Sequence, residues 1–323
     1  MSLKSVLQQN STEKKSICDS VIGFNPISLE DRELYNSYLF ASGERGCENS
    51  FSNAYMWAEQ RIAIIKDSLV RLAQFGEYEF YSYPLGDGNK SEVIKSMEED
   101  ACARGIAFTI GGITPELKEE LEREFPGRYK YIERRNSFDY VYEIDALATL
   151  SGKKYHSKRN HCSRFEKEHP DYHIEEITES NIHLCVEMVD SWYREKEMNN
   201  PTIDYRGEKR AIELAFNNYK ELDLEGVLLL CDEKVVAFAM GNKMSYNTFD
   251  VNFEKAENGI NGAYAVINRE FASFIKNKHP EIKYLNREED MGIEGLRKAK
   301  ESYYPHHMVI KYRAMLSEDS DEI

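Results

Sequence analysis

The sequence predicts an α/β protein built from two halves that repeat the same order of strands and helices. Its length of 323 residues suits two domains. Hydrophobic residues at 41% and charged residues at 31% are typical of a globular chain. Each half can be divided into a similar series of elements, so we expect domains over 17–150 and 151–317 and flexible termini at 1–16 and 318–323.

The first half begins with a short strand and two helices and continues with three strand-like runs that would form a meander. A glycine-containing loop at 85–90 then leads into a helix, a strand, a second helix and a closing hairpin. Alternating apolar residues predict the strands, and apolar residues at helical spacing predict the helices. The expected elements are strand 24–27, helices 30–41 and 48–59, strands 61–66, 68–75 and 78–84, helix 91–104, strand 106–112, helix 115–125, and a hairpin of 129–134 with 137–145.

The second half shows the clearest pattern. Residues 172–177 alternate as a strand does, and Thr178 is a suitable N-cap for the helix that follows. Pro305 ends the last helix, because proline cannot continue it. The expected elements are strand 172–177, helices 178–196 and 208–220, strands 226–232, 234–241 and 247–256, a helix from the loop at 257–264 to about 277, strand 283–288, helix 293–304 and strand 307–316.

A predicted helix over 152–169 joins the halves and is unusually basic. It holds six Lys or Arg residues against two Glu residues, in a chain whose net charge is −15. One interpretation is the solvated face of an interdomain helix. The other is an anion site for a phosphate or a nucleotide end, with Lys158, Arg159 and Arg164 as its members.

The acidic composition limits the expected partners. A net charge of −15 repels long nucleic acids and anionic membranes, and no apolar run approaches the ~18 residues that span a bilayer. The six cysteines include no C-x-x-C pair, which predicts reduced thiols and a cytoplasmic protein. No metal is expected, because His306 and His307 would diverge on a strand and Glu166 with His169 forms a single Glu-x-x-His.

The segment 285–305 gathers the most chemically active side chains. Three consecutive acids end its predicted strand, and strand alternation places Glu288 and Asp290 on one face and Glu289 on the other. Ligands in open α/β sheets commonly bind at strand ends. Adjacent acids repel one another, so the segment predicts either a functional site or an ion-pair network that joins strand to helix.

The loop at 257–264 is a second candidate, because it opens a helix. Backbone N–H groups at a helix start can bind phosphate, and Gly259 and Gly262 allow close approach of a ligand. The loop matches neither a P-loop nor a G-x-G-x-x-G motif. The alternative is therefore a plain turn that caps the helix.

The order of elements, a meander followed by a helix, a strand, a helix and closing strands, is the pattern of the GNAT acyltransferase fold. We therefore expect an α/β protein with mixed sheets and two tandem GNAT-like domains. Over 24–312 the chain also resembles the bacterial family similar to the C-terminal domain of phosphatidylglycerol lysyltransferase, which is related to Fem-type aminoacyltransferases. The motifs that carry the resemblance are GCENSFSNAYMW, KRNHCSRF, FEKAENGINGAY and NREEDMGIEGLRKAKESYYP.

The resemblance implies transfer of an acyl or aminoacyl group to an unknown amine or hydroxyl. The donor would be an acyl-coenzyme A or an aminoacyl-tRNA, with no tightly bound cofactor. The alternative is a non-catalytic GNAT-fold protein that binds a ligand or partner. The implied roles are Glu288 or Asp290 as base, Tyr303 as acid, Lys255 with Arg287 to position the acceptor or stabilise charge, and Gly259, Asn261 and Gly262 with the basic helix to hold the donor's phosphate.

Overall fold

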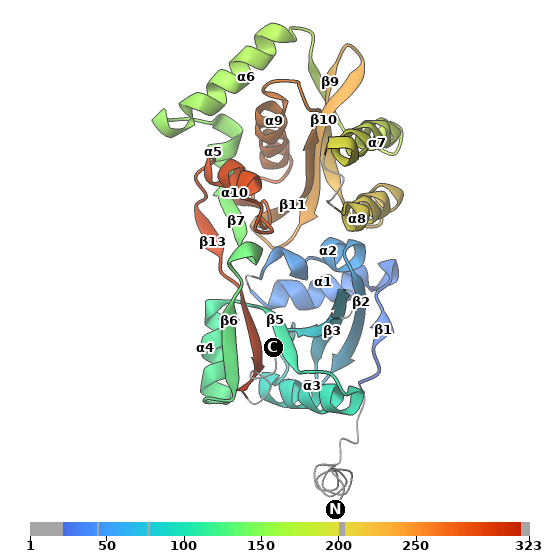
Figure 1. Cartoon of the computed structure of the whole chain (residues 1–323), viewed down its shortest axis with the longest axis vertical. Helices are drawn as coiled ribbons and strands as arrows, with labels where there is room; N and C mark the ends of the chain where they lie inside the picture. Colours follow the sequence, from blue (N-terminus) through green and yellow to red (C-terminus); the bar gives the residue numbers. More distant parts are fainter. Residues whose placement is uncertain (1–21, 44, 76–77, 200–203, 318–323) are drawn as a thin grey trace, which may run out of the picture.

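The computed structural model describes residues 22–317 except 44, 76–77 and 200–203, and it contains two seven-stranded mixed sheets (Figure 1). The first sheet has the order β1 (Asn25–Pro26), β2 (Glu59–Ile65), β3 (Ser68–Phe75), β4 (Tyr78–Ser82), β5 (Thr109–Ile113), β14 (Tyr312–Leu316) and β6 (Tyr129–Glu133). The second has the order β13 (His307–Val309), β7 (Asp139–Glu143), β12 (Tyr284–Asn286), β11 (Thr248–Ala256), β10 (Lys234–Lys243), β9 (Glu225–Cys231) and β8 (His173–Glu176). The prediction of an α/β fold with two tandem GNAT-like halves is confirmed.

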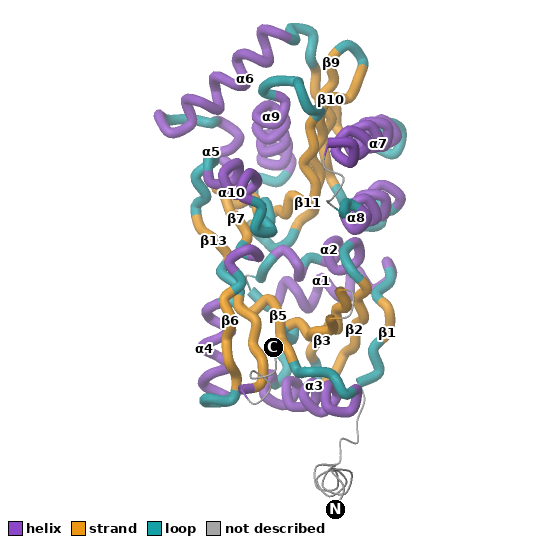
Figure 2. Tube along the Cα trace, viewed as in Figure 1, coloured by secondary structure: helices purple, strands orange, loops and turns teal. Residues whose placement is uncertain are grey.

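Helices cover both sheets, which Figure 2 shows as separate groups of strands along the long axis of the molecule. The helices are α1 (Arg32–Ala41), α2 (Phe51–Met56), α3 (Lys90–Arg104), α4 (Pro115–Glu124), α5 (Ile144–Thr149), α6 (His156–Glu168), α7 (Ile182–Asn199), α8 (Arg206–Asn217), α9 (Ala263–Lys278) and α10 (Glu294–Glu301). Single 3-10 turns lie at Leu29–Asp31, Cys47–Asn49, Arg135–Ser137 and Lys153–Tyr155. The predicted helix at 48–59 is therefore shorter than expected, because β2 already begins at Glu59.

Each sheet contains one strand from the other half of the chain. β7 pairs with β12 and β13 in the second sheet, and β14 lies between β5 and β6 in the first sheet. The predicted hairpin of 129–134 with 137–145 is wrong, since its two strands belong to different sheets. The predicted strand 307–316 divides into β13 and β14 for the same reason. The boundary at residue 150 stays a prediction, but neither sheet is built from one side of it alone.

Three hydrophobic cores stabilise the molecule, and one of them contains residues of both halves. Helices α3 and α4 pack on the first sheet, and α5, α6 and α9 pack on one face of the second. A further core contains Tyr35 and Phe51 from the first half together with Trp192, Ala211 and Phe238 from the second. Burial of these large side chains stabilises the contact between the halves by about 1.5–3 kcal/mol for each apolar residue.

The paired part of β11 and β12 ends at Asp250 and Asn286. Strand β11 continues to Ala256, whereas β12 stops and the chain turns away at Glu288, which has a positive φ of 57°. Two parallel strands that separate in this way leave polar side chains of the sheet interior without a neighbouring strand. The separation therefore positions the candidate site.

Three remaining expectations can be compared with the structure. The predicted flexible termini, 1–16 and 318–323, lie outside the described residues. Cys47, Cys162, Cys185 and Cys231 are free and buried, but Cys102 is disulfide-bonded, so the prediction of reduced thiols is wrong at that position. None of the described helices combines the length and the apolar character that crossing a membrane requires.

Candidate functional site

Five carboxyl groups from both halves meet where β11 and β12 separate. We call this set the acidic cluster: Glu48, Asp139, Asp250, Glu288 and Glu289. Lys311, between β13 and β14, is buried within it and donates hydrogen bonds to Asp139 at 2.6 Å and to Glu48. The cluster exists because the exchanged strands carry Asp139 and Lys311 to the junction of the halves.

The first half contributes the donors that hold the cluster together. The backbone N–H of Cys47 donates to Asp139 at 2.7 Å. The Asn53 amide donates to Asp250 at 3.0 Å and to Glu288 at 2.8 Å. Asn53 lies on α2, whose N-cap Ser50 also bonds to Asp250 at 3.3 Å. One short helix of the first half thus contacts acids on two elements of the second.

Burial and mutual repulsion raise the pKa of several of these acids. Burial and the neighbouring charge of Glu289 raise the pKa of Glu288 to about 8. Burial, Glu288 and Asp139 raise the pKa of Asp250 well above its ordinary value, and burial is the main cause that raises the pKa of Glu289. The cluster therefore holds protons at neutral pH, which is the condition for exchanging a proton with a substrate.

The other groups of the cluster have fixed protonation states. Burial alone would lower the pKa of Lys311, but Asp139 and the other nearby acids raise it well above its ordinary value, so the ammonium stays charged. Burial and the charge of Asp139 raise the pKa of Cys47 well above that of a free thiol. Cys47 is therefore a neutral thiol, which is a poor nucleophile.

Cys47, Glu48 and Asp139 have ligand atoms close enough together to hold a metal ion. The Lys311 ammonium, however, already bonds to both of these carboxylates. A cation therefore occupies this position within the fold, and the residues do not fit an additional metal ion. The sequence predicts no metal site. Cys47, Glu48 and Asp139 do not suit one either, because Lys311 already pairs with the two carboxylates.

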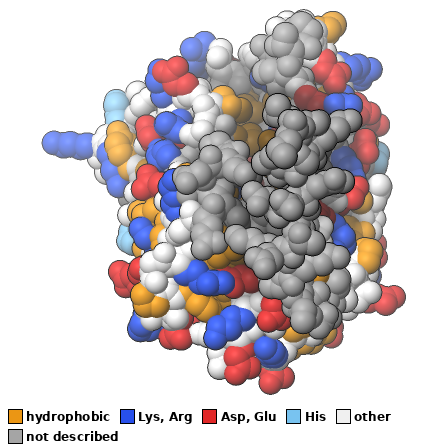
Figure 3. Space-filling view, turned by 60° about the horizontal axis from the view of Figure 1, so that its bottom comes forward, with side chains coloured by type: hydrophobic (Ala, Val, Ile, Leu, Met, Phe, Trp, Pro, Cys, Tyr) orange, Lys and Arg blue, Asp and Glu red, His pale blue; other side chains and the backbone are white. Residues whose placement is uncertain are grey.

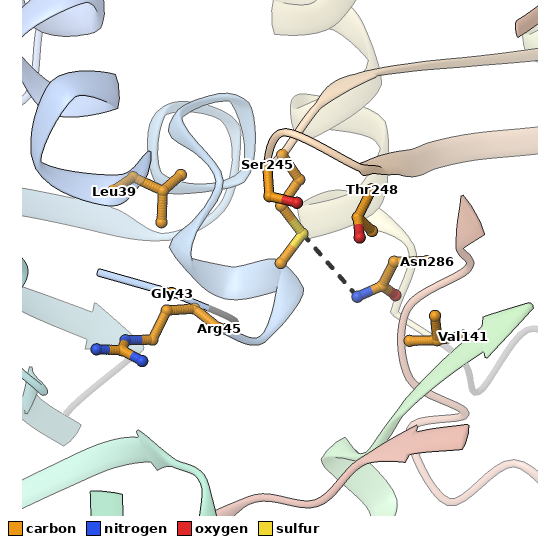
Figure 4. Close-up of a pocket in the computed structure, with 8 residues that line it drawn as sticks. Leu39, Gly43, Arg45, Val141, Ser245, Thr248 and Asn286 are labelled. Atoms are coloured by element: carbon orange, nitrogen blue, oxygen red, sulfur yellow. Dashed lines mark hydrogen bonds between the residues drawn. The ribbon is translucent and has the colours of Figure 1, made fainter. Parts of the chain in front are cut away.

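A small pocket reaches the acidic cluster from the side of α1 and the β10–β11 turn (Figure 4). Its lining residues are Leu39, Gly43, Arg45, Val141, Met244, Ser245, Thr248 and Asn286. The Asn286 amide lies 4.0 Å from the sulfur of Met244 and donates to Asp139 at 3.0 Å. The pocket therefore meets the cluster at Asn286.

Asp290, a predicted base, is held as a structural carboxylate. It is fully buried and accepts hydrogen bonds from Tyr140 at 2.6 Å, Arg297 at 2.8 Å and Arg135 at 3.0 Å. Burial would raise its pKa, but the hydrogen bonds from Arg297, Tyr140 and the Gly292 backbone outweigh burial and lower it. A carboxylate with a lowered pKa and filled acceptors is a weak base, so this geometry favours Glu288 over Asp290.

A second set of residues, three of them predicted, meets on the other side of 287–289. We call it the cationic pocket: the predicted Lys158, Arg287 and Tyr303 together with Glu254 and Ser302. Lys158 donates to Ser302 at 2.6 Å and lies 3.8 Å from the centre of the Tyr303 ring. The Arg287 guanidinium lies 5.0 Å from the same ring and pairs with Glu254 at 2.8 Å. Burial raises the pKa of Tyr303, so its phenol keeps its proton.

Lys255 lies apart from both sets. Its ammonium pairs with Glu208 on α8 at 2.6 Å and lies 4.0 Å from the centre of the Trp192 ring. Burial lowers its pKa, although Glu208 opposes the effect. Because Glu208 and Trp192 already contact it, Lys255 is held as part of the packing of α7 and α8 on the second sheet.

The predicted donor loop is partly covered by α6. Gly262 begins α9 with a φ of 90°, and a Cβ there would lie 2.5 Å from the backbone oxygen of His161. Gly259, also with a φ of 90°, has open space around it, and Asn261 is exposed. A backbone oxygen close to a helix start disfavours an anion there, so the geometry favours the turn-and-cap interpretation of this loop.

The three predicted cations of the basic helix do not form one site. Arg159 donates to the backbone oxygens of Leu150 and Gly152, and therefore stabilises the end of α5. Arg164 is exposed and pairs with Glu168 one turn along the helix. Of the three, only Lys158 contacts another predicted site residue, because its ammonium lies over the ring of Tyr303.

Comparisons with known proteins give the family and the fold. Residues 40–315 match the family model described as phosphatidylglycerol lysyltransferase, C-terminal. A protein of unknown function from Bacteroides thetaiotaomicron is 38% identical, with a TM-score of 0.88 over 92% of this chain and 100% of that one. The C-terminal domain of a putative lysylphosphatidylglycerol synthetase from Agrobacterium fabrum is 14% identical, with a TM-score of 0.66 over 89% of this chain and 92% of that one, which shows a shared fold.

A curated relative extends the comparison over part of the chain. An uncharacterized protein from Mycoplasmoides gallisepticum is 24% identical over 182 residues. The match spans 55% of this chain and 56% of that relative. It supports common ancestry over about half of each protein.

Proposed function

The chain belongs to the family of phosphatidylglycerol lysyltransferase C-terminal domains, and we propose that it is an aminoacyltransferase whose reaction takes place at the acidic cluster. The observation that carries the proposal is the position of Glu288, a partly buried carboxyl among the other acids of the cluster, where burial and Glu289 raise its pKa to about 8. A base with a pKa near the working pH is the most effective proton acceptor. Asn53 fixes one of its oxygens from the opposite half.

The reaction would be transfer of an aminoacyl group from an ester to an amine or a hydroxyl. The Glu288 carboxylate takes the proton of the acceptor, and the acceptor's nitrogen or oxygen forms a bond to the ester carbonyl carbon. The carbon–oxygen bond of the ester then breaks, and the proton passes to the departing ribose oxygen. The protonated Lys311 nearby supplies positive charge that stabilises the ionised form of the cluster.

We favour an aminoacyl-tRNA donor over an acyl-coenzyme A donor. The pyrophosphate of coenzyme A would need the N-terminus of α9, where the backbone oxygen of His161 lies against Gly262. An aminoacyl-tRNA has no pyrophosphate next to its ester, so it does not need this loop for binding. The similar protein from Agrobacterium fabrum is described as a putative lysylphosphatidylglycerol synthetase, which is compatible with aminoacyl transfer.

The test compares donors and then removes the proposed base. The chain is mixed with aminoacylated total tRNA or acetyl-coenzyme A, together with a range of amine and hydroxyl acceptors, and loss of the donor is followed. We expect turnover of the tRNA ester and at least ~100-fold slower turnover by Glu288→Gln. Thermal stabilisation by a donor without turnover of any donor would instead favour the non-catalytic binding protein.

A further inference from the structure

The cationic pocket contains more positive than negative charge. Two cations, Lys158 and Arg287, face Glu254, which is the one carboxylate that pairs with either of them within the part of the chain that the structure describes. Glu254 is shared further, because its second oxygen accepts a hydrogen bond from Asn268 on α9 at 3.0 Å. One positive charge therefore lacks a counter-charge in a mostly buried place.

The hydrogen-bond donors of the pocket are also incompletely used. The buried Nη1 atom of Arg287 has no hydrogen-bond partner among the described residues. The Arg287 side chain is only 12% exposed, so water reaches it poorly. Burial and the charge of Arg287 lower the pKa of Lys158 to about 8. An excess of positive charge and an unsatisfied guanidinium nitrogen in such a place cost free energy, which an anion would recover.

We propose that the cationic pocket binds the phosphate group of a nucleotide, held by Lys158 and Arg287. Arginine and lysine are the side chains that bind phosphate most often. This inference rests on the proposed function, because the phosphate would be the one next to the terminal ribose of the aminoacyl ester. Arg287 directly precedes Glu288 in the chain, so the segment 287–289 connects the cationic pocket to the acidic cluster.

A neighbouring aromatic surface favours a nucleotide over a lipid headgroup. Tyr304 follows Tyr303 and is 48% exposed. Tyr304 adopts a positive φ of 56°. A bulky residue rarely enters the left-handed region, so this φ indicates that the surrounding structure constrains the backbone here. Lys154 lies 5.4 Å from the centre of the Tyr304 ring. An exposed ring with an adjacent cation is the arrangement on which a base stacks.

The test measures binding directly, by calorimetry on the full chain with adenosine monophosphate, adenosine, inorganic phosphate and glycerophosphoglycerol. We expect adenosine monophosphate to bind at least ~10-fold more tightly than adenosine, because only the former carries the phosphate. Glycerophosphoglycerol represents the lipid headgroup. Equal affinity for adenosine and its monophosphate would overturn the phosphate site, and tighter binding of glycerophosphoglycerol would overturn the nucleotide assignment.

Two variants test the phosphate contact and the base contact separately. Lys158→Ala should weaken adenosine monophosphate binding by ~10-fold or more, whereas Lys298→Ala, which removes an exposed lysine of α10, should change it less than twofold. Tyr304→Ala should weaken adenosine monophosphate by ~5-fold or more and leave inorganic phosphate unchanged. Tyr304 is exposed, so this variant tests the assignment even if Lys158→Ala fails to fold. Unchanged binding in both variants would contradict the proposal.

These measurements separate the inference from the proposed function. Binding of adenosine monophosphate needs no turnover, so a chain that binds it through Lys158 but transfers nothing retains the phosphate site and loses the enzyme assignment. Conversely, aminoacyl transfer that is unaffected by Lys158→Ala, with no difference between aminoacyl-adenosine and an aminoacylated trinucleotide as donors, would keep the enzyme and reject the phosphate site.

Discussion

The acidic cluster and the cationic pocket lie on either side of the same short segment, 287–289, yet they are assembled differently. The cluster takes Glu48 from the first half and Asp250 from the second, and Asn53 of the first half donates to it. It depends on the exchanged strands for Asp139 and for the bound Lys311. The pocket takes all of its residues from the second half. The proposed phosphate site is therefore built from one half, whereas the surroundings of the proposed base require both.

Among the tests of this comparison, we expect the largest effect for Lys311→Ala, on the free energy of unfolding. The variant leaves Asp139 buried without its cation, so the free energy of unfolding should fall by ~3–5 kcal/mol. Urea denaturation measures the change. The control Lys298→Ala removes an exposed lysine and should cost no more than ~0.5 kcal/mol. A loss below ~1 kcal/mol for Lys311→Ala would show that the cluster does not depend on this pairing.

The next effect concerns the base. Aminoacyl transfer by the unchanged chain should rise as the pH increases toward 8, because the pKa of Glu288 is about 8 and only its ionised form accepts a proton. Glu288→Gln should lower kcat by ~10²–10⁴-fold and remove this rise. Asp290→Asn is the matched comparison: it perturbs a structural carboxylate and should keep the rise. A pH profile that survives in Glu288→Gln would assign the base elsewhere.

Glu288 should also influence stability as a function of pH. Its pKa in the folded chain, about 8, lies above the ~4.3 of an unfolded glutamate. The stabilising contribution of this group is therefore fully present below pH ~4.3 and is lost as the pH rises through about 8. The Tm of Glu288→Gln should exceed that of the unchanged chain by a few degrees (~2–4 °C for each kcal/mol) at pH 9. The difference should vanish toward pH 4.

A smaller effect is expected in the cationic pocket. Binding of adenosine monophosphate should weaken by ~10-fold between pH 7 and pH 9, because the pKa of Lys158 is about 8 and its ammonium loses its proton over this range. Lys158→Arg should bind without this pH dependence, since an arginine stays charged. Calorimetry at three pH values measures both. Affinity that does not change with pH in the unchanged chain would contradict a role for the Lys158 ammonium.

The smallest effect is expected for Arg164→Ala. Arg164 is exposed and pairs with Glu168 within α6, so its loss should change the free energy of unfolding by less than ~0.5 kcal/mol. Binding of adenosine monophosphate should stay within twofold of the unchanged chain. On the face that Figure 3 shows, basic and acidic side chains likewise alternate instead of forming one basic area. A clear loss of binding in Arg164→Ala would extend the phosphate site along α6.

The sequence pointed to three residues of the cationic pocket, Lys158, Arg287 and Tyr303, without grouping them, and to less of the acidic cluster. Lys158 and Tyr303 were both predicted, because they lie in a basic helix and in a segment dense with charged side chains. Of the cluster, only Glu288 was proposed for catalysis. Apart from the adjacent Glu289, its partners are 38 to 240 residues away, at Asp250 and Glu48 respectively. The strand exchange that brings them together has no local pattern.

One local signal for the cluster was present in the sequence. Asp250, Asn252 and Glu254 alternate with other residues in the predicted strand 247–256, so they share one face of the sheet. Polar residues at core-facing positions of such a strand are unusual unless they are paired or functional. In the structure Asp250 and Asn252 contact Asn53, and Glu254 belongs to the cationic pocket. This alternation gave more information than the glycines of the following loop.

The position of β14 also determines when the first half can complete its sheet during synthesis. This strand lies between β5 and β6, yet its residues, Tyr312–Leu316, leave the ribosome after every other described strand. Until then β5 pairs only with β4, and β6 has no partner strand among the described residues. The usual order, in which an N-terminal domain folds first, is therefore unavailable to this chain. Premature termination just before Tyr312 would damage the half of the protein that had been made first.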